Sequence, residues 1–141
     1  MSEKLSFVFD VDGKDFTSAG QASVQIKKIL RRLGISAEII RRVSIAMYEG
    51  EINMVIHAGG GKATVTVNEE CIEITLADNG PGISDIDKAM QEGYSTAPDN
   101  VRALGFGAGM GLPNMKRYSD SMDISSTVGV GTTIVMKVKL F

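Results

Sequence analysis

Apolar residues occupy every second position near the start of the chain: Leu5, Phe7, Phe9 and Val11. A repeat of two predicts a strand with one buried face, here over residues 3–11. The repeat then changes, because apolar side chains recur at helical spacing from Ala22 onward. This second pattern predicts a helix over residues 17–33, with Gly34 as its stop signal.

A further helical pattern follows Ser36, whose hydroxyl suits an N-cap, and continues to about His57. The glycine-rich segment 59–62 then predicts a turn. Two β-rich runs come next, "KATVTVN" and "CIEITLAD", separated by a short connection. They predict an antiparallel hairpin.

The second half of the chain begins with turn chemistry, "NGPG", and a short helical piece over residues 84–91. A polar, glycine-containing stretch over residues 93–109 predicts a long loop. "MGLPNMKRYSD" predicts another helix, and "MDISSTV" with "GTTIVMKVKL" predicts a closing pair of strands. Without repeats or linkers, this order favours a single α/β two-layer sandwich over residues 1–141.

Composition narrows the classes of protein. A chain of 141 residues that is 43% hydrophobic suits one compact domain, and its net charge of −2 gives no general attraction to nucleic acid or membrane. One cysteine, Cys71, excludes an internal disulfide and fits a reducing compartment. The start of the chain has no apolar leader region, so we expect a cytoplasmic protein without a nucleic-acid or membrane partner.

Glycine occupies alternate positions directly before the helix that begins near residue 111: Gly105, Gly107, Gly109 and Gly111. Glycines can turn successive backbone N–H groups toward one point, and the helix start adds its own unpaired N–H groups, so the run suits a polyphosphate. A flexible loop that binds nothing is the alternative. The spacing excludes a P-loop and a dinucleotide fingerprint.

Asp78 ends a predicted strand and opens into a turn that contains Gly80 and Gly82. A carboxylate in this place can accept a hydrogen bond from an exocyclic amine such as adenine N6, and the glycines would let a flat ring approach the backbone. An ordinary β-turn explains the same residues. Thr132 or Thr133, at the start of the last strand, would reach across to Asp78 and complete such a site.

Glu49 and Asn53 are four residues apart, so a helix presents them on one face. A carboxylate and a carboxamide among apolar neighbours suggest a polar ligand. Mg²⁺ that bridges phosphates would take an oxygen of Asn53, and Glu49 would be free to act as a base. A solvent-facing polar stripe is the alternative, and Glu51 must point elsewhere on the helix.

These motifs, in this order, resemble the N, G1, G2 and GT boxes of the GHKL ATPases, the superfamily of gyrase B, Hsp90, histidine kinases and MutL. The resemblance implies a Bergerat ATP-binding fold, a mixed and mainly antiparallel sheet with helices on one face. Few residues follow the last box, which favours the stand-alone anti-sigma-factor serine kinases of the RsbW, SpoIIAB and RsbT group, with the RsbT-like branch most similar.

The resemblance implies a Mg-ATP-dependent serine/threonine kinase that acts on a small STAS-domain antagonist, with a homodimer as one assembly. Glu49 would be the base and Asn53 the Mg²⁺ ligand. Asp78 would read adenine and the alternating glycines would wrap the phosphates. The alternatives are an ATP-dependent binding module that sequesters a partner without phosphoryl transfer, an ATPase clamp, and a structural domain without nucleotide.

Overall fold

A computed structural model describes residues 4–13, 20–91 and 111–141. Its helices and strands follow in the order β1 (Leu5–Asp12), α1 (Gln21–Arg32), α2 (Ala37–Ala58), β2 (Gly60–Val67), β3 (Cys71–Ala77), α3 (Ile86–Ala89), α5 (Gly111–Tyr118), β4 (Ser121–Thr127) and β5 (Gly131–Lys139). The predicted loop over 93–109 lies outside the described residues, as do the glycines at 105, 107 and 109.

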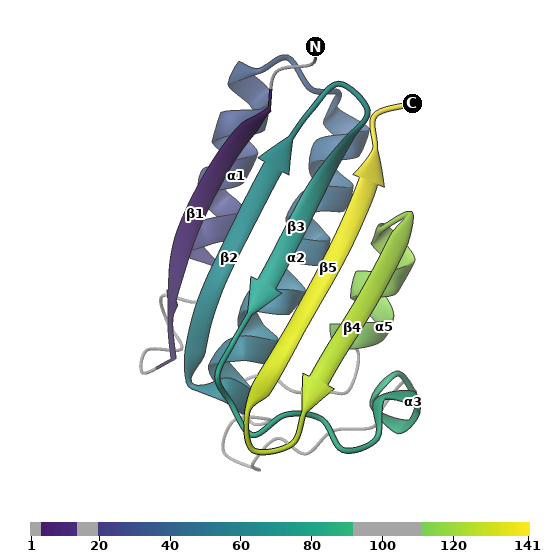
Figure 1. The fold of residues 1–141 in the computed structure, drawn as a ribbon. Coiled ribbons are helices and arrows are strands. Elements are labelled where there is room, and N and C mark those ends of the chain that lie inside the picture. Colours follow the sequence, from purple (N-terminus) through teal and green to yellow (C-terminus); the bar gives the residue numbers. More distant parts are fainter. Residues whose placement is uncertain (1–3, 14–19, 92–110) are drawn as a thin grey trace.

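The strands form one sheet in the order β1-β2-β3-β5-β4. Every pairing among the described residues is antiparallel, so the sheet is not the mixed one that the sequence led us to expect. Short turns join β2 to β3 and β4 to β5, whereas α1 and α2 lie between β1 and β2 in the chain, and α3 and α5 lie between β3 and β4 (Figure 1). The predicted hairpin of β2 and β3 and the closing pair of β4 and β5 are confirmed.

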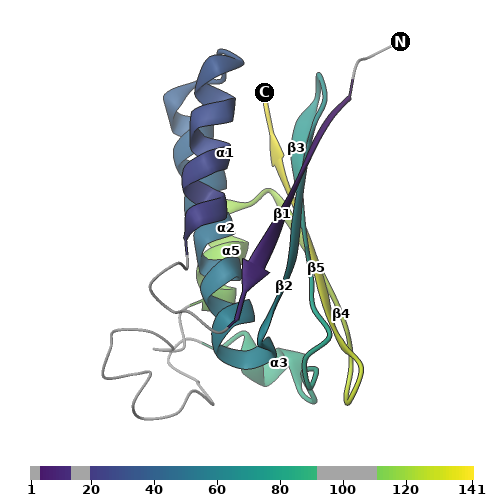
Figure 2. The same ribbon diagram turned by 90° about the vertical axis from the view of Figure 1, so that its left-hand side faces the viewer.

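Helices α1, α2 and α5 cover one face of the sheet, and the described elements leave the other face open (Figure 2). The strands alternate accordingly: side chains such as Ile74 and Met136 point into the core, and Thr64 and Thr75 point outward. Helix α2 supplies Val43 and Met47 to the same core. The two-layer sandwich predicted from the hydrophobic pattern is therefore confirmed.

Helix α2 has the limits that its sequence predicts. The Ser36 hydroxyl accepts a hydrogen bond from the backbone N–H of Ile39 at 3.4 Å, and Gly59 ends the helix in the left-handed region with φ of 71°. Ser36 therefore caps the start of the helix with its hydroxyl, and Gly59 ends the helix because glycine adopts the left-handed region easily. Helix α1 is shorter than predicted, because it begins at Gln21.

The glycine-rich segment 59–62 was predicted as a turn, and this prediction is wrong for all but Gly59. Strand β2 already begins at Gly60, which pairs with Asp12, and Gly61 pairs with Val11. A Cβ at Gly60 would lie 2.2 Å from the carbonyl oxygen of Val11. Glycine is needed here because strand β1 runs too close for a side chain, and because the backbone of Gly60 has φ of 104°.

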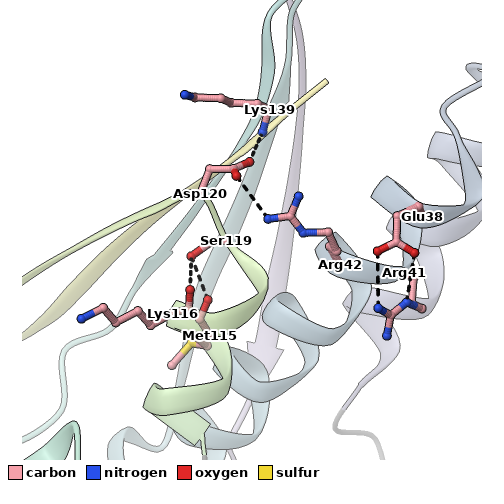
Figure 3. Close-up of polar contacts among 8 residues, drawn as sticks. All are labelled: Glu38, Arg41, Arg42, Met115, Lys116, Ser119, Asp120 and Lys139. Atoms are coloured by element: carbon pink, nitrogen blue, oxygen red, sulfur yellow. Dashed lines mark hydrogen bonds and ion pairs between the residues drawn. The ribbon is translucent and has the colours of Figure 1, made fainter. Parts of the chain in front are cut away.

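Helix α5 is attached to its neighbours at its C-terminal end. Arg42 of α2 donates to the Asp120 carboxylate at 3.3 Å, and the backbone N–H of Lys139 donates to the other oxygen of Asp120 at 2.6 Å (Figure 3). The guanidinium of Arg41 lies 5.5 Å from the ring centroid of Tyr118, the last residue of α5. These contacts fix where α5 lies against α2 and β5.

No helix in the described part of the chain combines the length and apolar character that crossing a bilayer requires.

Candidate functional site

Asp78 follows β3 directly and lies against the start of β5. Its Oδ1 atom accepts the backbone N–H of Gly80 at 2.9 Å and that of Thr132 at 3.1 Å. Its own backbone N–H donates to the carbonyl of Thr132 at 3.0 Å. One carboxylate oxygen is thereby fixed by the backbone on both sides, and this sets the direction of the other.

Glycine is needed at residues 80 and 82 of this turn for two different structural reasons. A Cβ at Gly80 would lie 2.6 Å from the Cβ of Ala58, at the end of α2. Gly82 has φ of 81°, and a Cβ there would lie 2.5 Å from the carbonyl oxygen of Thr127. Both glycines let the turn pack closely against protein backbone or side chains. An approach by a flat ligand ring remains a prediction for Gly82.

Thr132 meets Asp78 as predicted, but through its backbone. Its hydroxyl lies 2.8 Å from the hydroxyl of Ser126 on β4. Ser126 Oγ also accepts the backbone N–H of Ile83 at 2.7 Å, so it ties the turn after Asp78 to the β4–β5 hairpin. The sequence pattern gave no signal for Ser126, because a serine on an edge strand is ordinary.

Glu49 lies on the side of α2 that faces the start of α5. A Cβ at Gly111 would lie 3.7 Å from its Oε2 atom, which places the first turn of α5, from Gly111 to Asn114, beside the carboxylate. Burial raises the pKa of Glu49, and a hydrogen bond from the Asn114 side chain opposes this rise because it favours the charged form. A partly buried carboxylate with a raised pKa suits a general base.

Glu51 points away from Glu49, as predicted, and has a structural task. It is 2% exposed. Its carboxylate accepts the backbone N–H groups of Gly20, Ala22 and Ser23 at 2.9, 3.2 and 2.7 Å. These are the N–H groups at the start of α1, which has no N-cap side chain of its own. Helix α2 therefore caps helix α1.

Asn53 is one turn beyond Glu49 on α2 and is partly exposed. Among the described residues, no group of three or more His, Cys, Asp or Glu side chains is placed to hold a metal ion. One carboxamide oxygen fits the way in which Mg²⁺ is commonly bound, by few protein ligands together with substrate phosphates and water. His57, a further turn along, has its pKa lowered by burial.

The described candidates gather at one end of the two layers. Helix α2 ends there, β3 ends there with Asp78, and β5 and α5 begin there with Thr132 and Gly111 (Figure 1). Residues far apart in the sequence are thus brought together. The carboxylate of Asp78 lies on the sheet side of the C-terminal half of α2, and the carboxylate of Glu49 lies on the side that faces α5. The arrangement offers a hydrogen-bond acceptor at the sheet side and a base at the helix side.

Comparison with known proteins gives a family and several relatives. The family described as histidine kinase-, DNA gyrase B- and HSP90-like ATPase matches residues 38–141. The anti-sigma F factor of Clostridium novyi is 33% identical over 97% of this chain and 93% of its own length. The serine/threonine-protein kinase RsbT of Bacillus subtilis is 31% identical over 77% of this chain and 78% of its own length.

A solved structure has the same fold. The crystal structure of the SiaB–SiaC complex from Pseudomonas aeruginosa matches with a TM-score of 0.56 and covers 94% of this chain and 89% of that chain. Sequence identity is 10%, so this likeness concerns the fold alone.

Proposed function

The chain belongs to the histidine kinase-, DNA gyrase B- and HSP90-like ATPase family, and from this premise we propose that it is a Mg-ATP-dependent protein serine/threonine kinase. It acts as a regulatory switch of the anti-sigma-factor type, as the names of two groups of relatives support. The family predicted from the ordered motifs is confirmed. The relatives include both anti-sigma F factors and the RsbT kinase, so the predicted group is confirmed as well.

The observation that carries the proposal is the placement of Glu49. Its carboxylate lies beside the first residue of α5, it is held by Asn114, and it stands one turn from Asn53. A base is of use to a kinase only where the phosphates and the acceptor hydroxyl meet. The start of α5, directly after the glycine run, supports phosphate binding at this place.

The transfer step requires one proton acceptor and in-line geometry. The hydroxyl oxygen of an acceptor serine forms a bond to the γ-phosphorus of ATP, and the bond from that phosphorus to the β–γ bridging oxygen breaks. The serine proton goes to the Glu49 carboxylate, and ADP leaves with the electron pair of the broken bond. Glu49 afterwards returns the proton to solvent.

Asp78 and the glycines have the binding roles in this proposal. The Oδ2 atom of Asp78 accepts a hydrogen bond from adenine N6, with Thr132 beside it. Gly80 and Gly82 shape the turn that follows. Gly111 and the glycines at 105, 107 and 109 bind the phosphates through their backbone N–H groups. Asn53 supplies the protein ligand of Mg²⁺, which would neutralise phosphate charge and orient the γ-phosphoryl group.

The partner is a protein, and we propose a small STAS-domain antagonist that carries the acceptor serine. The name of the relatives, anti-sigma F factor, supports a regulatory protein as partner. We further propose that the chain works in the cytoplasm as one domain over residues 1–141, and that it forms a homodimer.

Transfer from γ-labelled ATP in an extract of the source cells tests the proposal. The wild-type protein is expected to label a band of small-domain size, and Glu49→Ala is expected to reduce this labelling at least about hundredfold, because general-base catalysis contributes this much. ATP binding, measured by calorimetry, should be unchanged in the variant. Labelling at the wild-type rate by Glu49→Ala would remove Glu49 from the chemistry.

A binding module that sequesters a partner without transfer is the second candidate. It shares the ATP site and needs no base. Stable retention of ATP by the wild-type protein, with no labelled band in the extract, would favour it. Release of phosphate without any labelled protein would point instead to an ATPase clamp.

A further inference from the structure

Asn114 is the neighbour of Glu49 that no sequence motif suggested. It lies three residues after Gly111, so α5 presents the two residues on the same face, toward Glu49. A hydrogen bond from its side chain favours the charged form of the Glu49 carboxyl group and so opposes the rise in its pKa. Gly111 itself approaches Glu49 but has no side chain with which to orient the carboxylate. Of these two described neighbours on α5, Asn114 is the one whose side chain can orient the Glu49 carboxylate.

The amide of Asn114 is itself held in one orientation. Arg117, three residues further along α5, donates from its guanidinium to Asn114 Oδ1 at 3.5 Å. A guanidinium only donates, so it selects the carbonyl oxygen of the amide. The opposite end of the amide, the NH₂ group, is then directed to the carboxylate, which only accepts when ionised. The contact with Arg117 therefore favours the amide orientation in which the NH₂ group of Asn114 is available to the Glu49 carboxylate.

The position of Asn114 depends on where α5 lies, and that is fixed at the other end of the helix. The guanidinium of Arg41 lies over the ring of Tyr118. Arg42 donates to the carboxylate of Asp120 (Figure 3), and both arginines belong to α2. Gly111 lies beside Glu49, eight residues further along α2 than Arg41, so the two helices run antiparallel in contact. Asn114 lies between these two attachments and has little freedom to move away from Glu49.

We propose that Asn114 is a positioning residue for the phosphoryl-transfer reaction: it holds the Glu49 carboxylate toward the acceptor hydroxyl, and Arg117 sets the orientation of its amide. This role rests on the proposed function, because it requires Glu49 to be the base. Asn114 contacts neither reacting atom. Its loss should slow the transfer and leave ATP binding as it is, since a misdirected base costs rate and not affinity.

Purified variants, added to a fixed amount of source-cell extract with γ-labelled ATP, test this role. Asn114→Ala is expected to lower the maximal labelling rate roughly tenfold while the KM for ATP stays within about twofold of wild type. Asn114→Asp keeps the size of the side chain and an acceptor for Arg117 but lacks the N–H donor, so it should be slow as well. Lys116→Ala, an exposed side chain on the same helix, is the matched control and should label like wild type.

Each outcome has a distinct meaning. Wild-type labelling together with an equal rate for Asn114→Ala or Asn114→Asp overturns the positioning role and leaves the kinase proposal intact. A parallel loss of rate and ATP affinity also overturns it, because Asn114 would then be a nucleotide contact. Absence of labelling by the wild-type protein overturns the kinase proposal and the positioning role together. Thermal unfolding of each variant, monitored by circular dichroism, checks that every protein whose rate is measured is folded.

Discussion

Helix α2 presents two glutamates, two residues apart, to its two helical neighbours, and they are satisfied in opposite ways. Glu51 faces α1 and accepts three backbone N–H groups. Glu49 faces α5, and the bond that opposes its raised pKa comes from one side chain, Asn114. Burial raises the pKa of both carboxyl groups. Burial therefore does not distinguish the structural carboxylate of Glu51 from the proposed base, Glu49, whereas the kind of partner does.

The difference has a physical reason. Backbone N–H groups at a helix start lose their partners if the carboxylate leaves, so Glu51 cannot turn to a ligand without cost to α1. A side-chain partner such as Asn114 orients a carboxylate and leaves part of its surface for another group. The α1–α2 contact is thus built for stability, and the α2–α5 contact leaves a carboxylate available for chemistry.

The largest expected effect breaks the structural side of this comparison. Glu51→Ala removes the acceptor of three N–H groups at the start of α1, two residues of which, Ala22 and Ser23, are buried. The expected loss is about 3 kcal/mol in the free energy of unfolding, from the lost cap and the unpaired donors. Urea unfolding should show a lower midpoint with an unchanged slope.

Glu51→Gln is the matched control for this prediction. It keeps one acceptor oxygen for the start of α1 and loses the charge, so its loss of stability should lie between those of wild type and Glu51→Ala. An unfolding midpoint for Glu51→Ala equal to that of wild type would mean that the start of α1 finds other partners, and the contrast between the two glutamates would lose its structural half.

Asp78 combines the two arrangements and sharpens the comparison. Its Oδ1 accepts two backbone N–H groups, as Glu51 does, and Oδ2 is assigned to adenine N6 in the proposed function. Asp78→Asn can keep the bonds to Oδ1 but turns an NH₂ group toward the donor on adenine. We expect ATP binding to weaken roughly hundredfold while the stability of the fold changes little, because a site built to pair one group rejects a mismatched one.

Calorimetry with ATP and a urea unfolding curve, run on the same Asp78→Asn sample, separate the two oxygens. Unchanged affinity would remove Asp78 from adenine recognition. A large loss of stability would show that both oxygens serve the turn.

Much of this architecture could be predicted from the sequence because it depends on local patterns. The repeat of two in β1, the Ser36 cap and the end of α2 near His57 all depend on residues within a few positions of the feature itself. The approach of Thr132 to Asp78 was also predicted, since Asp78 follows the end of one strand and Thr132 stands at the start of another. Local chemistry and edge placement were enough for these features.

The contacts that the sequence did not predict join residues far apart along the chain. Glu51 is about thirty positions from the helix start that it caps, and Ser126 is 43 positions from Ile83. Asn114 meets Glu49 only because α5 packs antiparallel on α2. No spacing rule relates such pairs. Gly60 and Gly61 were assigned to a turn for the same reason, because the strand that pairs with them, β1, lies far earlier in the sequence.

The smallest expected effect, a shift in pH dependence, tests the functional side of the comparison. A general base acts only when deprotonated, so kcat/KM should rise with pH through the pKa of Glu49, and burial places this rise above the ordinary glutamate value of 4.5. Asn114 favours the charged form, so Asn114→Ala should raise the pKa of Glu49 further and move the acid limb to higher pH. Labelling rates measured across a pH series at low ATP concentration give the acid limb of kcat/KM for wild type and for Asn114→Ala. The titration of ATP itself is the same in both series, so it cancels when the two proteins are compared. If the acid limbs of wild type and Asn114→Ala coincide, the amide does not act through the Glu49 carboxylate. The side-chain partner that distinguishes Glu49 from Glu51 would then have no effect on the reaction.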